Sequence, residues 1–380
     1  MKVTIAIDSL KGSLSSLEAG SAIGEGVKKA WPEAEVCVRP LADGGEGTVE
    51  AVVSAMGGEI VTLPVTGPLG STVDCSYGVI AKSKTAVLEM AGAAGITLLK
   101  DGEKNPMVTT TYGVGEVIRD GIKRGCRHFL VGIGGSATND GGVGMLQALG
   151  FGMLDEKGNQ VPFGAQGLEV LRRIEDGDAM PELKECTFRI ACDVTNPLCG
   201  PWGCSAIYGP QKGADEEMIA RMDRWMEAYG ALVEKKYPGT DSKTPGCGAA
   251  GGIGFAFYAF LGGVLESGIK IVLEETRLAD YVKDADIVVT GEGRLDGQTV
   301  MGKAPIGVAK TAKEYGKKVI AFSGSVTKDA IACNAAGIDA FFPILRRIVT
   351  LKEAMDPAAA RENMTDTSEQ VFRLIRACMK

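Results

Sequence analysis

Four short apolar runs, two near each end of the chain, lead directly into loops of glycines, small polar residues and acids. The runs cover residues 3–7, 36–39, 286–290 and 318–322. The first three are each followed by a segment with helical periodicity. A strand that opens onto a loop and then a helix is the repeating unit of a parallel sheet, whose loops gather at its carboxyl edge. Both ends of the chain are therefore expected to form one doubly wound domain.

The middle of the chain follows a different pattern. From residue 62 to residue 90, threonine and valine alternate between turns, which is typical of antiparallel strands. Further helices and two strands, one leading into residue 132 and one at residues 188–191, are expected before residue 280. We therefore predict an α/β protein of two domains: a discontinuous Rossmann-like domain, residues 1–65 and 285–380, and an inserted mixed α/β domain, residues 66–284.

Composition narrows the class of protein. The net charge of −7 gives no basic footprint for nucleic acid. Ten cysteines without a C-x-x-C pair, together with a single histidine, exclude the usual zinc spacings and favour reduced thiols in a cytoplasmic protein. The first apolar run breaks at Asp8, so no signal peptide is expected. Residues 246–265 contain no charged residue. Seven of them are glycines, which favours a buried loop and helix over a membrane span.

The most glycine-rich loop is GIGGSATNDGG, residues 132–142. It lacks the Gly-Lys-Ser/Thr of a P-loop and the spacing of a dinucleotide fingerprint. Its backbone N–H groups and its Ser, Thr and Asn side chains could still surround a phosphate chain. The alternative is a turn whose glycines serve close packing only. Because four other loops share its format, phosphate binding is the favoured interpretation.

General base chemistry falls to carboxylates in this chain. The single histidine, His128, precedes a strand and is expected at the surface. Asp193 is the strongest candidate base because it follows an apolar strand, with Asn196 one turn away and Pro197 fixing that turn. A carboxylate base with Mg²⁺ and cationic side chains is the arrangement that phosphoryl transfer uses.

Other candidates lie in the same kind of loop. Acids that could bind a metal or substrate hydroxyls, although helix or loop capping would also explain them, are Asp43, Glu46, Asp140, Glu292 and Asp296. Cations that could bind anions, although solvated surface positions would also explain them, are Lys11, Lys212, Arg294 and Lys303.

These loops together resemble the bacterial glycerate kinase family over nearly the whole chain. The matching segments are DSLKGSLS (8–15), ADGGEGT (42–48), VTGPLG (65–70), GIGGSATNDGG (132–142), ACDVTNPL (191–198), GPQKGA (209–214), GAAGGIG (248–254) and TGEGRLD (290–296). Gly12 departs from the family, in which an acidic residue is common at this position. The resemblance implies a two-domain glycerate kinase fold and Mg²⁺-assisted transfer of phosphate from ATP to D-glycerate, giving 2-phosphoglycerate.

We assign the candidate residues on this basis. Catalysis is assigned to Asp193, Lys11 and Asp43. Nucleotide phosphates are assigned to Gly134, Gly135, Ser136, Thr138, Asn139, Asp140 and Gly141. Substrate binding is assigned to Asp8, Ser9, Asn196, Lys212, Arg294 and Lys303, and metal binding to Glu292 and Asp296.

Alternatives remain at this stage. The product could be 3-phosphoglycerate, the substrate another small hydroxy acid, or the chain a nucleotide- or anion-binding protein without kinase activity. The expected partners are ATP and D-glycerate alone, with no nucleic acid or membrane, in a monomer or homodimer.

Overall fold

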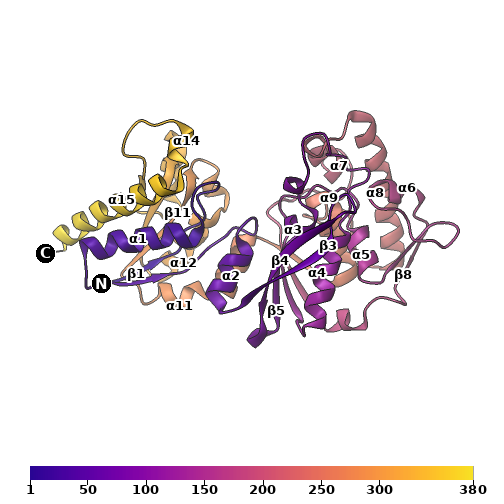
Figure 1. Cartoon of the computed structure of the whole chain (residues 1–380), viewed down its shortest axis with the longest axis horizontal. Helices are drawn as coiled ribbons and strands as arrows, with labels where there is room; N and C mark the ends of the chain where they lie inside the picture. Colours follow the sequence, from indigo (N-terminus) through magenta and orange to yellow (C-terminus); the bar gives the residue numbers. More distant parts are fainter. Residues whose placement is uncertain (380) are drawn as a thin grey trace. The chain divides into compact units, whose positions relative to one another are not determined.

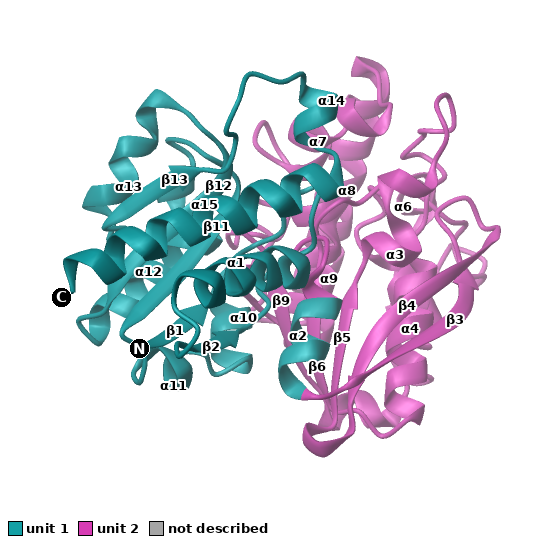
Figure 2. Cartoon of the chain, turned by 60° about the vertical axis from the view of Figure 1, so that its left-hand side comes forward, with its two compact units in different colours: residues 1–43, 50–56, 269–380 teal, residues 44–49, 57–268 magenta. Residues whose placement is uncertain are grey.

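The computed structural model describes residues 1–379, which divide into two compact units (Figure 2). Of these residues, unit 1 holds 1–43, 50–56 and 269–379, and unit 2 holds 44–49 and 57–268. We expected the boundaries after residues 65 and 284. In the structure they occur earlier, after residues 56 and 268. Residues 59–66 belong to unit 2 because they pair with its strand 72–80, and residues 278–282 pack on helix 304–314 of unit 1.

Unit 1 is built on a five-stranded parallel sheet with the order β13-β12-β11-β1-β2. Val3 pairs with both Ile287 and Val36, so the first strand lies between one from each end of the chain. The strands are β1 (Lys2–Ile5), β2 (Glu35–Val38), β11 (Ile287–Leu295), β12 (Lys318–Val326) and β13 (Ala340–Pro343). The helices are α1 (Ser16–Ala30), α2 (Thr48–Met56), α10 (Gly268–Glu275), α11 (Leu278–Val282), α12 (Ala304–Glu314), α13 (Ala332–Ala335), α14 (Leu351–Ala354) and α15 (Pro357–Cys378).

Helices α1 and α15 pack closely over the sheet (Figure 1). Helix α1 begins at a capping box, in which the Ser15 hydroxyl accepts from the Glu18 N–H and the Glu18 carboxylate accepts from the Ser15 N–H. A Cβ at Gly26 would lie 2.0 Å from the Ser368 hydroxyl, so only glycine permits this approach of α15. The long C-terminal helix therefore completes the core that the first β-α-β segment begins.

Unit 2 contains a six-stranded mixed sheet, in the order β10-β9-β6-β5-β4-β3. The strands expected from the threonine and valine alternation form an antiparallel meander, whose last strand continues into parallel pairing with β6. The strands are β3 (Glu59–Thr66), β4 (Thr72–Ile80), β5 (Thr85–Glu89), β6 (His128–Gly132), β7 (Gly152–Leu154), β8 (Arg173–Glu175), β9 (Thr187–Ala191) and β10 (Val264–Glu266). The helices are α3 (Ala91–Ala94), α4 (Tyr112–Lys123), α5 (Val143–Ala148), α6 (Gln166–Val170), α7 (Cys204–Tyr208), α8 (Glu216–Lys236) and α9 (Ala249–Leu261).

The uncharged stretch after residue 246 is buried inside unit 2. Helix α9 begins with a left-handed turn at Ala250, Gly251 and Gly252, and a Cβ at Gly251 would lie 2.0 Å from the carbonyl oxygen of Thr138. The glycines therefore allow the start of α9 to pack against the loop that follows β6. Among residues 1–379, no helix combines the length and apolarity that a bilayer crossing requires.

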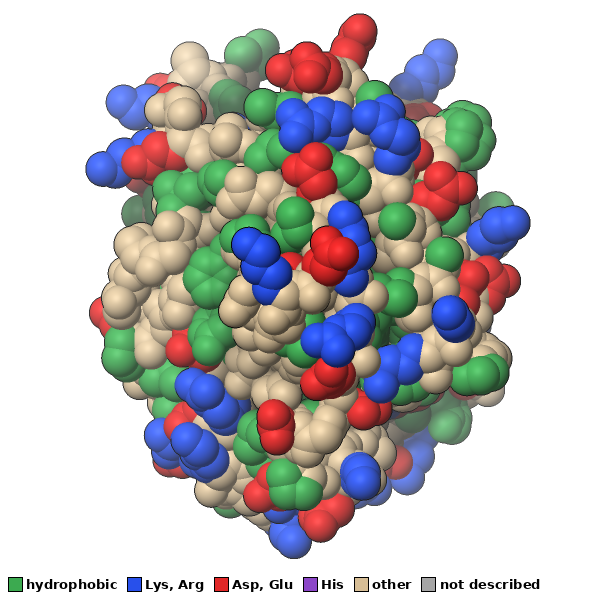
Figure 3. Space-filling view, turned by 90° about the vertical axis from the view of Figure 1, so that its right-hand side faces the viewer, with side chains coloured by type: hydrophobic (Ala, Val, Ile, Leu, Met, Phe, Trp, Pro, Cys, Tyr) green, Lys and Arg blue, Asp and Glu red, His purple; other side chains and the backbone are tan. Residues whose placement is uncertain are grey.

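The surface carries charges of both signs. On the face shown in Figure 3, Lys and Arg side chains are interspersed with Asp and Glu. His128 is exposed at the first residue of β6, where its Nδ1 lies 2.9 Å from the Thr187 hydroxyl. Its ring therefore lies at the amino end of the strand, away from the carboxyl edge that is expected to bind ligands.

Candidate active site

A cavity of ≈ 520 Å³ lies at the carboxyl ends of the strands of unit 1. Its walls come from the segments that follow β1, β2 and β13, from the ends of β11 and β12, and from α14. The lining residues are Asp8, Ser9, Leu10, Lys11, Ser13, Asp43, Glu292, Gly293, Arg294, Asp296, Lys303, Gly324, Ser325, Ile344, Leu345, Leu351, Ala354 and Met355.

The strand order explains why a cavity forms here. Numbered by their sequence order within unit 1, the strands lie in the order 2-1-3-4-5, which is the order of flavodoxin-like sheets. In such sheets the connections diverge between the first and third strands, and ligands bind at that switch point. Asp8 follows β1 and Glu292 lies on β11, so both residues lie at the switch point.

Asp8 is held in the cavity with little solvent around it. Its N–H continues the pairing of β1 by donating to the Gly291 carbonyl at 2.9 Å, and one carboxylate oxygen accepts from the Ser9 N–H at 2.7 Å. The residue is 5% exposed. Burial, reinforced by the negative charge of Asp43, raises the pKa of Asp8 to about 7, against opposing effects of the Ser9 N–H and Lys11. Asp8 can therefore exchange a proton near neutral pH.

Lys11 and Asp43 form an ion pair at the same edge of the sheet. The Nζ of Lys11 lies 3.7 Å from Oδ2 of Asp43, and the lysine side chain is 59% exposed. An exposed pair of this kind adds little to stability. The ammonium is nevertheless held beside the cavity, where a ligand anion can reach it.

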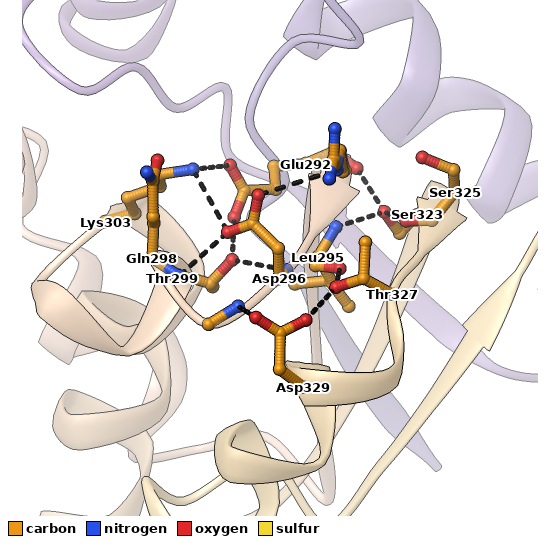
Figure 4. A network of polar contacts seen from close by, with 12 residues as sticks. Glu292, Leu295, Asp296, Gln298, Thr299, Lys303, Ser323, Ser325, Thr327 and Asp329 are labelled. Atoms are coloured by element: carbon orange, nitrogen blue, oxygen red, sulfur yellow. Dashed lines mark hydrogen bonds and ion pairs between the residues drawn. The ribbon is translucent and has the colours of Figure 1, made fainter.

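A second polar network surrounds Lys303 (Figure 4). Its Nζ lies 3.6 Å from Oε2 of Glu292 and 3.8 Å from Oδ1 of Asp296. The Thr299 hydroxyl donates to the other oxygen of Glu292 at 2.7 Å, and Arg294 lies 3.5 Å from Asp296. Burial raises the pKa of Glu292, whereas its bond to Thr299 and the charge of Lys303 lower it. Two carboxylates thus converge on one ammonium group.

Strand β11 extends further than the sequence pattern suggests. The segment expected to open as a loop after Thr290 continues as strand through Leu295, and Arg294 pairs with Ser325 of β12. Gly291 makes this possible, because a Cβ at its φ of 153° would lie 1.8 Å from the Phe322 carbonyl oxygen. The Ser323 hydroxyl donates to the Glu292 carbonyl and accepts from the Leu295 N–H, which secures the extension.

The glycine-rich loop of unit 2 is organised around Asp140. This buried carboxylate accepts from the N–H and the hydroxyl of Thr111, both at 2.8 Å, and from the N–H groups of Gly142 and Gly144. Burial raises the pKa of Asp140, and these donors oppose the shift. All of these contacts lie inside unit 2, so the carboxylate fixes the shape of the loop.

The polar groups beside Asp140 are also directed inward. Lys212, expected to bind substrate, is buried and donates from Nζ to the Thr138 carbonyl at 2.6 Å, and burial lowers its pKa to about 8. Asn139 is buried and donates to the Ser205 hydroxyl at 2.9 Å. A Cβ at Gly141 would lie 2.8 Å from the Tyr229 ring. These residues have the contacts of a packed interior.

Other members of the loop are closer to solvent. Gly134 and Gly135 are exposed, whereas Ser136 is 8% exposed. Of the residues assigned to nucleotide phosphates, these two glycines alone are exposed. Their backbone is the part of the loop that a ligand of unit 2 could reach most readily.

Asp193 and Asn196 lie beyond the carboxyl end of β9. Asp193 is exposed, and its Oδ1 accepts from the Gly268 N–H at 3.2 Å. Asn196 accepts from the Tyr208 hydroxyl at 2.6 Å and donates to the Trp202 carbonyl at 2.8 Å. Asn196 therefore shapes the loop, and Asp193 bonds to the backbone at the first residue of α10.

The apolar side of the unit 1 cavity was missed by sequence reasoning. It is contributed mainly by residues 344–355, which include α14. One signal for this helix was readable: Thr350 and Glu353 form a capping box with the spacing T-x-x-E. The position of α14 beside the cavity depends on tertiary packing, and no pattern in the sequence predicts it.

Comparisons with known proteins agree with each other. A family model described as the glycerate kinase family matches residues 3–376. The chain is 46% identical to glycerate 2-kinase of Escherichia coli (strain K12), covering 100% of this chain and 99% of that one. It is 45% identical to glycerate kinase of Bacillus subtilis (strain 168), covering 99% and 98%. A crystal structure described as a glycerate kinase 2 from Salmonella typhimurium LT2 superposes with a TM-score of 0.92 at 46% identity, covering 100% and 99%.

Proposed function

The chain belongs to the glycerate kinase family, and we propose that it transfers the γ-phosphate of ATP to the 2-hydroxyl of D-glycerate, giving 2-phosphoglycerate and ADP. One observation carries the proposal: the unit 1 cavity combines a carboxyl group that titrates near neutrality with three accessible cations. Transfer to the 2-hydroxyl is supported by the similarity to a relative named glycerate 2-kinase.

Asp8 is the proton acceptor in this proposal. As the substrate hydroxyl oxygen forms its bond to the γ-phosphorus, the bond from that phosphorus to ADP breaks and the hydroxyl proton passes to Asp8. A general base works best when its pKa lies near the operating pH, and Asp8 meets this condition. Asp193, expected from sequence to fill this role, is exposed and remains the second candidate.

Lys11, Arg294 and Lys303 bind the anionic groups. All three line the cavity, on a protein whose net charge of −7 would otherwise repel both substrates. Cations beside the phosphates offset the charge of the transferring group, and this electrostatic stabilisation supplies much of the catalysis of phosphoryl transfer. Asp43 keeps Lys11 at the edge of the cavity through its ion pair.

Glu292 and Asp296 fit a magnesium ion. Mg²⁺ is usually bound by one or two carboxylates, with waters and substrate phosphates completing its six positions. Both acids already lie near the same cation, the ammonium group of Lys303. Their oxygens are therefore close enough together to bind one metal ion. Bound Mg²⁺ would neutralise phosphate charge. Within residues 1–379 no group of three or more His, Cys, Asp or Glu side chains is placed to bind a metal, so phosphate oxygens would be needed to complete this site.

The proposal is tested by following ATP and D-glycerate with purified protein and Mg²⁺. NMR of the product should show phosphate on the 2-hydroxyl, and ADP release should require D-glycerate. A signal from 3-phosphoglycerate would move the reaction to the other hydroxyl. Faster turnover with another small hydroxy acid would identify that acid as the substrate in place of D-glycerate. If ADP release did not depend on any added acid, kinase activity itself would be contradicted.

A further inference from the structure

The unit 1 cavity has an apolar wall that the chemistry above does not use. Ile344 and Leu345 follow the edge strand β13, and Leu351, Ala354 and Met355 come from α14 and the residue after it. These five side chains, which we call the apolar wall, line the same cavity as Asp8, Lys11 and Arg294. The cavity is therefore charged on one part of its surface and hydrocarbon on another.

Two members of the wall are left open to solvent. Leu351 is 76% exposed and Met355 is 38% exposed, whereas Ile344 is buried. Apolar side chains gain free energy only when a partner removes their surface from water. Glycerate and phosphate are hydrophilic throughout, so neither gains from contact with this wall.

Cavity size gives a second constraint. At ≈ 520 Å³ the cavity lies within the range of about 300–1,000 Å³ that is typical of sites for drug-sized ligands. A three-carbon acid would fill a small part of it. The matching ligand has a flat apolar portion for the wall and an anionic portion for Lys11, Arg294 and Lys303.

We propose that this cavity is the nucleotide site, with the adenine ring of ATP against Leu351 and Met355 and the polyphosphate beside the three cations. The inference rests on the proposed function for the identity of the nucleotide. It moves the nucleotide from the glycine-rich loop of unit 2 to the switch point of unit 1. In that loop Thr138, Asn139 and Asp140 are buried, the Asn139 side-chain nitrogen donates to Ser205, and the Asp140 carboxylate is bonded internally, although the Thr138 hydroxyl and the Asn139 side-chain oxygen have no hydrogen-bond partner.

The wall is held in place by two local features. The capping box joins Thr350 to Glu353 at the start of α14. Met355 then packs over Gly12, where a Cβ would lie 2.7 Å from the methionine methyl group. The missing side chain at residue 12 therefore makes room for Met355 beside the cavity.

The chemistry of the wall predicts how the base is recognised. Four of its five side chains are hydrocarbon and the thioether of Met355 is only a weak acceptor, so the wall can contact the ring faces but reads their polar edges poorly. Hydrophobic sites discriminate weakly between ligands of similar shape. GTP should therefore replace ATP with a loss in kcat/KM of no more than about 10-fold.

The test compares Leu351→Asn/Met355→Asn with Ile348→Asn, a fully exposed residue of the same segment that does not line the cavity. The double variant should weaken ADP binding by calorimetry, and raise the KM for ATP, by about 10-fold. The KM for D-glycerate and inhibition by inorganic tripolyphosphate should stay within twofold, and Ile348→Asn should match the parent. Circular dichroism checks that each variant is folded.

Other outcomes would overturn the inference. A rise in the KM for D-glycerate with unchanged ADP affinity would show that the apolar wall contacts the acid substrate and not the nucleotide. Unchanged binding of both ligands would leave the wall outside the site. ADP binding that depends on the wall in a protein that phosphorylates no glycerate would instead contradict the proposed function and support the nucleotide site.

Discussion

Lys303 lies 3.6 Å from the carboxylate of Glu292, and the two side chains approach from different elements of unit 1. Glu292 belongs to β11, whereas Lys303 immediately precedes α12. The glutamate is 8% exposed, so its negative charge depends on this ammonium and on the Thr299 hydroxyl. A ligand phosphate entering the cavity would share the ammonium with the carboxylate.

Replacing Lys303 should therefore impair catalysis. Lys303→Ala is expected to lower kcat/KM for ATP by about 10–100-fold, because a cation beside the phosphates is lost and the Glu292 carboxylate is left without its counter-charge. Lys310→Ala is the matched control, because Lys310 is an exposed lysine on α12, the helix that Lys303 precedes. Steady-state kinetics in which both variants equal the parent would remove Lys303 from the site.

The activity should depend on the ionisation of Asp8. A base must be deprotonated to accept a proton, so kcat/KM is expected to rise with pH up to about 7 and then level off. Burial is the main cause of the raised pKa of Asp8, and the charges of Asp43, Lys11 and Glu292 and the Ser9 N–H modify it. Asp8→Asn should cut kcat by about 10²–10⁴-fold and abolish the rise. A variant that retains the parental pH profile would exclude Asp8 as the base.

The stability of the fold should fall over the pH range in which the activity rises. The pKa of Asp8 is raised on folding from its ordinary value of 3.8 to about 7, so the folded state binds the proton more tightly. The free energy of unfolding should therefore fall as the pH rises from about 4 to about 7. At pH 8, Asp8→Asn should be more stable than the parent by on the order of 2–4 kcal/mol, with a smaller difference at pH 4. Denaturant titrations at the two pH values measure this.

Asp193 provides the comparison for the base assignment. It is exposed and accepts from the Gly268 N–H, so Asp193→Asn should leave the fold intact and lower kcat by less than about 10-fold. The decisive measurement is kcat for Asp193→Asn and Asp8→Asn under identical conditions. A larger loss in the Asp193 variant would return the base to the position expected from sequence.

Asp140 should matter for stability rather than for nucleotide affinity. Its carboxylate accepts four hydrogen bonds in the interior, and Asp140→Ala would leave those donors unsatisfied. The expected loss is about 2–4 kcal/mol of unfolding free energy, seen as a lower melting temperature. ADP affinity of the folded variant should remain parental. A large loss of ADP binding in a protein of normal stability would restore the loop to the nucleotide site.

The charged residues that line the unit 1 cavity were all candidates from the sequence, and their roles there remain predictions. Asp8 and Asp43 follow parallel strands and Glu292 lies in the carboxyl-terminal half of one, and such strands bring their carboxyl ends to one edge regardless of separation in the chain. The roles of Asp140 and Lys212 were harder to anticipate. A loop rich in donors and acceptors looks the same in sequence whether its partner is a phosphate or the protein interior. The difference is made by Thr111, Ser205 and the start of α9, which only folding brings close.

The pairing of β1 with β11 has a consequence for biosynthesis. Residues 57–268 leave the ribosome as one continuous segment and contain nearly all of unit 2. Strand β1 can pair with β11 only after that segment has been made. Helix α1 can pack against α15 only later, when residues 357–378 have also been made. Domains fold as units during synthesis, and contacts between distant residues form slowly. The inserted unit can therefore mature first, and the edge of β1 that pairs with β11 stays unpaired until residues 287–295 have been made.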